Sequence, residues 1–260
     1  MLNVEKALKT MKEISIVAGH EILKRYKKGV QVEYKEDSSP VTEADKVAND
    51  VIVRSLKSEF NEIPILAEES ADDTSRLGAK YCFIVDPLDG TKEFINKNGE
   101  FTVNIALIED NRPIAGVIYV PVLEELYYAE KGRGAFMRAK GLDRPIKVSS
   151  RTGDIRLAKS RSHYSADLEK LIERNHIKKI VVAGSAYKGC LLARGDVEAY
   201  YRFGRIMEWD TAAMDIIITE AGGIFMGMDD RLFKYNKEDP RNPTGFYALN
   251  RSENALKMDC

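Results

Sequence analysis

The chain has 260 residues, of which 44% are hydrophobic and 31% are charged, and its net charge is only -1. A chain of this length buries a large core as one domain or as two closely joined subdomains. The small net charge argues against general attraction to nucleic acid or to an anionic membrane, so any recognition of phosphate has to be local. No apolar run reaches the length of a membrane span and no signal-peptide pattern is present, so we expect a cytoplasmic protein.

The cysteines and histidines lack the spacing of a zinc site. We expect the cysteines to be reduced, with Cys82 and Cys190 as core residues. The three histidines are scattered along the chain, which disfavours a histidine-rich metal site. Oxygen ligands are therefore expected for any bound metal.

Two helices are predicted near the start of the chain. Apolar residues recur at helical spacing through the first two dozen residues, which indicates a long amphipathic helix that ends at Gly29. Thr42 precedes a turn with acidic residues, as N-cap residues do, and predicts a second helix that runs to about Phe60. Asp45 therefore lies near a helix start.

The pattern of elements changes near residue 146. Before it, apolar segments predict strands at residues 63–67, 81–85, 101–108, 114–120 and 126–129. After it, strands and helices alternate, with strands expected at 156–158, 180–183, 197–201 and 223–226 and helices at 166–175, 187–193 and 209–221. We therefore expect an N-terminal subdomain of residues 1–146 and a C-terminal subdomain of residues 147–260, packed as one compact unit.

The most informative segment is DPLDGT, residues 86–91, which directly follows an expected buried strand. It places Asp86 and Asp89 three residues apart, and two close carboxylates repel each other and lose hydration. A divalent cation that prefers oxygen ligands offsets that cost, so the segment indicates a Mg²⁺ site. Taken alone, the same residues also suit an ordinary surface turn.

Two further acidic residues lie beside apolar stretches. Glu68 follows an expected strand, and Asp210 begins an expected helix. Each has an ordinary alternative, a solvated loop for Glu68 and a helix cap for Asp210. If these ends converge with Asp86 and Asp89 on one cleft, two or three Mg²⁺ ions would neutralise the four carboxylates and hold a phosphate between them.

Together, the segments EES at 68–70, DPLDGT at 86–91 and WDTAA at 209–213 resemble the Mg²⁺-dependent, lithium-inhibited inositol monophosphatase superfamily, over nearly the full chain. Further segments are similar to its 3'(2'),5'-bisphosphate nucleotidases: KEFI at 92–95, SRSH at 160–163, and Gly184-Ser185 with Lys188. The resemblance implies an α/β fold, a five-layer αβαβα sandwich with the active site between its two halves.

The resemblance also implies roles for individual residues. The implied metal ligands are four carboxylates and one backbone carbonyl: Glu68, Asp86, Asp89, Asp210 and Leu88. Asp45 and Thr91 are implied as a dyad that orients and deprotonates the attacking water, which suits a hydroxyl held by a carboxylate.

The substrate implied by the resemblance is 3'-phosphoadenosine 5'-phosphate, which is cleaved to AMP and phosphate. The implied substrate-binding residues are Gly90, Thr91, Ser162, His163, Gly184, Ser185, Lys188 and Arg202. The backbone N–H groups of Gly90 and Thr91 would bind phosphate oxygens, and Lys188 or Arg202 the phosphate that is not cleaved. On local evidence, His163 equally suits a surface position, Lys188 a solvated helix position and Arg202 an ordinary strand end.

One segment departs from the nucleotidase pattern, because Arg205 and Ile206 stand where Pro and Thr are expected. The loop that faces the substrate therefore gains a positive charge. The alternative enzyme is an inositol monophosphatase or a fructose-1,6-bisphosphatase-type sugar phosphatase. A non-catalytic module that senses nucleotide or metal is an alternative of another class, and the presence of every expected metal ligand disfavours it. The sequence does not indicate an oligomeric state.

Overall fold

The structure is a computed structural model that describes residues 2–28, 32–35 and 40–258. Two helices pack together at one side of the molecule: α1 (Val4–Lys28) and α2 (Glu43–Glu59). Thr42 caps α2 as predicted, since its side chain accepts a hydrogen bond from the Ala44 N–H. Gly29, which was expected to end α1, lies outside the described residues. A short antiparallel pair, β1 (Val32–Tyr34) and β2 (Pro40–Thr42), precedes α2.

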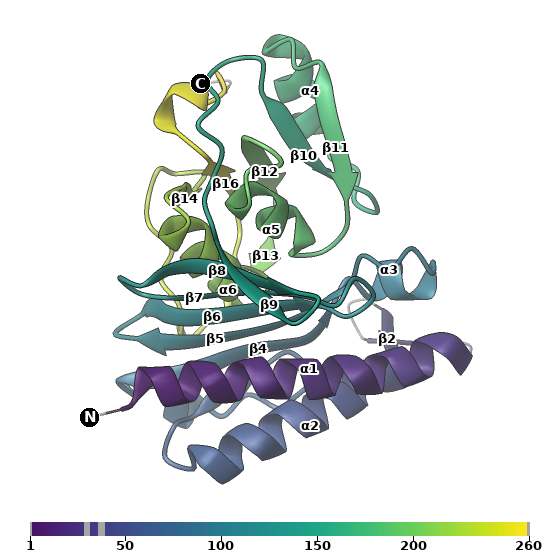
Figure 1. Cartoon of the computed structure of the whole chain (residues 1–260), viewed down its shortest axis with the longest axis vertical. Helices are drawn as coiled ribbons and strands as arrows, with labels where there is room; N and C mark the ends of the chain where they lie inside the picture. Colours follow the sequence, from purple (N-terminus) through teal and green to yellow (C-terminus); the bar gives the residue numbers. More distant parts are fainter. Residues whose placement is uncertain (1, 29–31, 36–39, 259–260) are drawn as a thin grey trace.

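A seven-stranded sheet lies against α1 and α2 (Figure 1). Its strands follow chain order: β3 (Ile65–Ala67), β4 (Tyr81–Asp89), β5 (Thr102–Glu109), β6 (Arg112–Val120), β7 (Glu125–Glu130), β8 (Gly134–Ala139) and β9 (Leu142–Ile146). The pair β3 and β4 is parallel, and the other neighbours are antiparallel. The short helix α3 (Thr91–Ile95) directly follows β4, and a turn of 3-10 helix, Thr74–Arg76, lies between β3 and β4.

The second half of the chain forms a five-stranded sheet and three helices. The sheet order is β11-β10-β12-β16-β14, with β10 (Arg156–Ser160), β11 (Lys179–Ala183), β12 (Ala199–Phe203), β14 (Ile224–Gly227) and β16 (Gly245–Leu249). The helices are α4 (Ala166–Arg174), α5 (Tyr187–Ala193) and α6 (Glu208–Glu220). The two-residue strands β13 (Ile206–Met207) and β15 (Arg241–Asn242) pair beside the start of α6, and a 3-10 turn, Ser252–Asn254, follows β16.

These elements stack in five layers, and the predicted αβαβα sandwich is confirmed (Figure 1). The order is α1 with α2, the seven-stranded sheet, α5 with α6, the five-stranded sheet, and α4. The middle layer is the most deeply buried, and most residues of α6 are buried because this helix packs between two sheets. Within the described residues, no helix is long and apolar enough to cross a membrane.

The helix α6 lies close to the seven-stranded sheet because β6 has a glycine at the crossing point. A Cβ atom at Gly116 would lie 2.6 Å from Ile216 Cγ2 and 3.0 Å from the backbone of Ala213. Any side chain at this position would push α6 away from the sheet. Since Asp210 lies in the first turn of α6, this contact sets how near that carboxylate comes to β4.

Candidate active site

The strand β4 delivers two of the predicted acidic residues. The apolar pattern predicted a strand over residues 81–85, but the strand continues to Asp89, with a shift of register between Asp86 and Asp89. Bulges of this kind redirect side chains at the end of a buried strand. Asp86 is 1% exposed, and its Oδ1 accepts a hydrogen bond from the Leu88 N–H at 3.0 Å.

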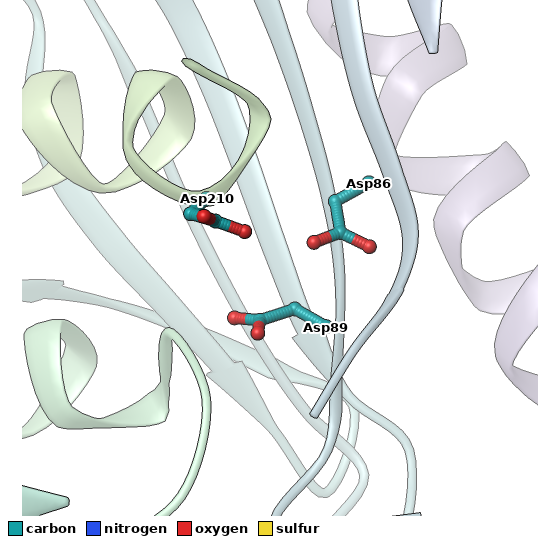
Figure 2. Close-up of side chains that lie close together, drawn as sticks. All are labelled: Asp86, Asp89 and Asp210. Atoms are coloured by element: carbon teal, nitrogen blue, oxygen red, sulfur yellow. The ribbon is translucent and has the colours of Figure 1, made fainter. Parts of the chain in front are cut away.

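Asp210 approaches the same point from the C-terminal half. Its Oδ2 accepts a hydrogen bond from the Met207 N–H at 2.9 Å, so the residue does cap α6, as its ordinary interpretation predicted. Its carboxylate nevertheless points toward those of Asp86 and Asp89, as Figure 2 shows. Capping and membership of an acidic cluster are therefore compatible at this position.

Asp86, Asp89 and Asp210 form one acidic cluster. Each offers a carboxylate oxygen, and these three oxygens all lie within 4.8 Å of one another. Burial, and then the neighbouring negative charges, raises the pKa of Asp86 well above its usual range and that of Asp210 to about 8. Such a set of converging oxygen donors fits a hard divalent cation, which removes the repulsion between them.

Glu68 lies near this cluster and is paired with a lysine. Lys35 Nζ is 2.9 Å from Glu68 Oε1 and 2.5 Å from Glu69 Oε1. Burial raises the pKa of Glu68 to about 7, although the Lys35 ammonium opposes the shift. The negative charge of Glu68 in turn raises the pKa of both Asp86 and Asp210, so the four predicted carboxylates share one electrostatic environment.

The predicted pair of Asp45 and Thr91 is in contact. Thr91 Oγ1 donates to Asp45 Oδ1 at 3.1 Å, while Asp45 Oδ2 accepts from the backbone N–H of Thr42 at 2.7 Å. Asp45 is therefore held between the start of α2 and the start of α3. Burial raises the pKa of Asp45, and the hydrogen bonds from Thr42 oppose the shift. Gly90 precedes Thr91 at a positive φ of 92°, a conformation that favours glycine.

A cavity of about 400 Å³ adjoins the acidic cluster. It is lined by residues from both halves of the chain: Pro40, Glu68, Asp89, Gly90, Thr91, Lys92, Glu93, Ser160, His163, Ser185, Ala186, Lys188, Tyr200, Arg202, Arg205, Ile206, Asp210 and Met214. The lining carries four carboxylates, those of Glu68, Asp89, Glu93 and Asp210, and four cationic side chains, those of Lys92, Lys188, Arg202 and Arg205. The cavity is thus suited to a ligand that bears phosphate groups.

Most of the predicted substrate-binding residues line this cavity, but Ser162 and Gly184 do not. The Gly184 N–H instead donates to Glu100 Oε2 at 2.8 Å. Lys188 is only 4% exposed and its ammonium donates to the Ser185 carbonyl oxygen at 2.6 Å, so its interpretation as a solvated helix residue is wrong. His163 is exposed, as its interpretation as a surface residue predicted, and it also lines the cavity; partial desolvation, followed by the charges of Arg202, Lys92 and Lys188, lowers its pKa to about 4.

Several lining residues were not predicted from the sequence. Lys92, Glu93, Ser160 and Tyr200 all line the cavity. The first three lie in the KEFI and SRSH segments that carry the resemblance, but the resemblance implied no role for them. The sequence around Tyr200 does not indicate a binding residue, because an aromatic residue in an apolar strand usually packs in the core.

The comparisons with known proteins agree over nearly the whole chain. The model of the inositol monophosphatase family matches residues 3–256. The 3'(2'),5'-bisphosphate nucleotidase CysQ of Salmonella typhimurium is 39% identical over 233 residues, which cover 88% of this chain and 94% of the relative. The CysQ of Buchnera aphidicola is 41% identical over 222 residues, 84% of this chain and 83% of the relative.

A solved structure is also similar. The crystal structure of CysQ from Bacteroides thetaiotaomicron, described as a bacterial member of the inositol monophosphatase family, matches with a TM-score of 0.82 and 36% identity, and covers 95% of this chain and 98% of that one. The resemblance inferred from the motifs is thereby confirmed. The chain belongs to the inositol monophosphatase family.

Proposed function

We propose that this protein is a Mg²⁺-dependent phosphatase that hydrolyses the 3'-phosphate of 3'-phosphoadenosine 5'-phosphate to AMP and phosphate. The observation that carries the proposal is a cluster of three converging carboxylates, Asp86, Asp89 and Asp210, that adjoins a cavity lined in part by cationic side chains. The bisphosphate nucleotidases among its relatives support this substrate.

The residues that would hold two or three Mg²⁺ ions are those of the acidic cluster, together with the Glu68 carboxylate and the Leu88 carbonyl. Oxygen donors from side chains and backbone are the ligands that Mg²⁺ prefers. When bound, the metal supplies Lewis-acid stabilisation of the phosphoryl group and acidifies the attacking water. Lys35, which pairs with Glu68 and Glu69, brings a further positive charge to the edge of this site.

Asp45 and Thr91 hold and move the proton of the attacking water. Because the Thr91 hydroxyl donates to Asp45 Oδ1, its lone pairs are free to accept a hydrogen bond from that water. The proton then passes through Thr91 Oγ1 to Asp45. Burial raises the pKa of Asp45, which makes its carboxylate a stronger base than an exposed aspartate.

The cationic part of the cavity receives the phosphate that is not cleaved. Lys188, Arg202 and Arg205 line this part, and the side chain of Arg205 is exposed. A guanidinium binds phosphate oxygens through two parallel hydrogen bonds. A substrate with two phosphates therefore uses both parts of the cavity, whereas a monophosphate uses only the part beside the carboxylates.

The test is the rate of phosphate release from matched substrates in MgCl₂. We expect the kcat/KM for 3'-phosphoadenosine 5'-phosphate to exceed those for inositol 1-phosphate and fructose 1,6-bisphosphate by at least tenfold. Adenosine 3'-monophosphate, which lacks the second phosphate, serves as the matched control and is expected to react more slowly. Faster turnover of inositol 1-phosphate or of the sugar bisphosphate would assign the enzyme to the alternative branch of the family.

A further inference from the structure

Glu93 is a buried residue with no role in the mechanism of hydrolysis proposed above. It lies in α3, two residues after Thr91, and is 2% exposed. Its side chain lines the cavity, yet within the described part of the chain no hydrogen bond or ion pair to its carboxylate is present. Its oxygens are not among the fully buried atoms that lack a partner in the described residues, which is consistent with a carboxylate that faces the cavity and is open to a partner there.

The surroundings of Glu93 hold its side chain in place. A Cβ atom at Gly184 would lie 2.4 Å from Glu93 Cγ and 2.9 Å from Cδ, and one at Gly90 would lie 3.3 Å from Oε2. The side chain is therefore enclosed between two glycines, one from each half of the chain. The carboxylate is pre-positioned where the α3 turn meets the turn before α5, and its remaining open side is the cavity.

The position of Glu93 along the cavity follows from its electrostatic neighbours. Its negative charge acts on Asp89, a member of the acidic cluster, and on Lys188, a member of the cationic part. Glu93 thus acts both on a residue proposed to hold the metal beside the reacting phosphate and on a residue proposed to bind the second phosphate. In a nucleoside bisphosphate, the group that joins these two phosphates is the ribose.

The chemistry of the partner is restricted. An ionised carboxylate only accepts hydrogen bonds, and a phosphate dianion also only accepts them, so Glu93 repels phosphate. The partner must be a hydrogen-bond donor. The ribose donor nearest the reacting 3'-phosphate is the hydroxyl on the adjacent carbon.

We propose that Glu93 accepts a hydrogen bond from the 2'-hydroxyl of the substrate and makes the enzyme specific for ribonucleotides. This inference rests on the proposed function, because it takes a 3',5'-bisphosphate as the substrate. A site built to bind a hydroxyl disfavours the analogue without it, since the buried acceptor is then left unpaired.

The test compares adenosine 3',5'-bisphosphate with its 2'-deoxy analogue. For the unmodified enzyme we expect kcat/KM to favour the ribonucleotide by roughly 10- to 100-fold. For Glu93→Ala this ratio should fall to about 1, mainly through a loss of activity on the ribonucleotide. Glu93→Gln keeps the side-chain volume and one acceptor oxygen, so the ratio of kcat/KM for the ribonucleotide to that for its 2'-deoxy analogue should be intermediate. This variant replaces Glu93→Ala in the test if the alanine variant folds poorly.

A matched control comes from a second carboxylate at the same junction. Glu100 Oε2 accepts the Gly184 N–H at 2.8 Å, and both Glu100 oxygens accept from Arg161 at 2.7 Å, but Glu100 does not line the cavity. If Glu93 acted only by supporting the Gly184 turn, Glu100→Gln would change the ratio in the same way. We expect Glu100→Gln to lower both rates by one common factor and to leave the ratio unchanged.

A binding measurement separates recognition from turnover. Calorimetry with AMP and 2'-deoxy-AMP should show tighter binding of AMP to the unmodified enzyme and equal binding of both to Glu93→Ala.

An unchanged preference for the ribonucleotide in Glu93→Ala overturns the inference about Glu93 and leaves the proposed function intact. If Glu93→Ala loses activity on adenosine 3',5'-bisphosphate but not on inosine 3',5'-bisphosphate, the carboxylate contacts the base. That result also overturns the inference about the 2'-hydroxyl. Failure of the unmodified enzyme to hydrolyse either nucleotide overturns the proposed function itself.

Discussion

Asp89 makes contacts that explain how a cluster of carboxylates is tolerated. Its Oδ2 accepts a hydrogen bond from the Ala186 N–H at 2.6 Å, and the Asn104 amide lies 3.4 Å from the same oxygen. Burial raises its pKa, while Lys188 and the Ala186 N–H oppose the shift. The protein thus compensates part of this negative charge with its own groups, and the remainder is available to a cation.

Replacement of Asp89 by asparagine tests the acidic cluster. The substitution keeps the shape and removes one charge, so we expect Mg²⁺-dependent hydrolysis to fall by at least 100-fold. The melting temperature in EDTA should be no lower than that of the unmodified protein, because repulsion among the carboxylates decreases. Initial rates and thermal unfolding check both parts. Full activity of Asp89→Asn would remove this residue from the metal site.

The imidazole of His163 provides a pH-dependent probe of ligand binding. Its pKa is lowered to about 4 by partial desolvation and by Arg202, Lys92 and Lys188, so it is neutral at pH 7. A bound phosphate group neutralises those cations, and we therefore expect AMP to raise the pKa of His163. Protonation of this imidazole is disfavoured in the folded state. The free energy of unfolding therefore decreases as the pH falls from 6.5, the ordinary pKa of histidine, toward 4, the pKa of His163 in the folded protein.

The measurement is a proton NMR titration of the imidazole signals with and without AMP. His20, which is exposed on α1, is the internal reference, because it lies outside the cavity. An upward shift of the His163 midpoint with AMP, and none for His20, is the expected outcome. Equal midpoints in the presence and absence of AMP would show that the phosphate binds elsewhere.

The helix α6 links the core to the site, since the same element packs in the middle layer and carries Asp210 in its first turn. Its burial was partly predictable, because the apolar residues Ala212, Ala213, Met214 and Ile216 to Ile218 are interrupted only by Asp215. Its distance from β6 was not, because that depends on Gly116, which has no distinctive sequence context. Elements are thus easier to predict than the separation between them.

The substitution Gly116→Ala tests this packing. The added methyl group meets Ile216 and the Ala213 backbone, so we expect the free energy of unfolding in urea to fall by about 1–3 kcal/mol. Displacement of α6 should also weaken Mg²⁺ binding. Gly189→Ala is the comparison, because its new methyl group meets only the side chains of Met214 and Ile218, and Met214 adapts its rotamer. A smaller loss for Gly116→Ala than for Gly189→Ala would contradict this account.

Sequence patterns predicted the elements with long apolar stretches and missed the short or exposed ones. The helix α5 was predicted with its observed bounds, Tyr187–Ala193, and α2 began at its expected cap. The strand β9 was missed because four of its five residues are exposed, so it lacks the alternation that identifies a half-buried strand. The strands β13 and β15 were missed because two residues do not establish a period.

Across the whole molecule, the two halves meet at the candidate site. Arg161 from the second half donates to both carboxylate oxygens of Glu100 from the first, and Ala186 donates to Asp89. The motifs identified the acidic residues through their resemblance to a known family, whereas spacing alone left each with an ordinary alternative. The burial of Glu93 was not predictable, because a glutamate between a lysine and an aromatic residue is usually solvated.

Binding of Mg²⁺ should stabilise the whole fold, because its proposed ligands come from both halves. A ligand that binds only the native state at 100 times its dissociation constant adds about 2.7 kcal/mol to the free energy of unfolding. We expect the melting temperature to rise with MgCl₂ and to remain unchanged with NaCl at equal ionic strength. The same titration on Asp89→Asn should show a much smaller rise. An equal rise with both salts would indicate screening of surface charge instead.

The late position of α6 in the chain has a consequence for synthesis on the ribosome. One face of the seven-stranded sheet, with Ile84, Ile118 and Tyr127, packs into the same core as α6, whose residues are translated some sixty positions after the last strand of that sheet. Until those residues emerge, the nascent chain exposes an apolar face and holds an incomplete set of carboxylates. A chain that stops before residue 208 would therefore expose an aggregation-prone apolar surface and would lack Asp210, one of the proposed metal ligands.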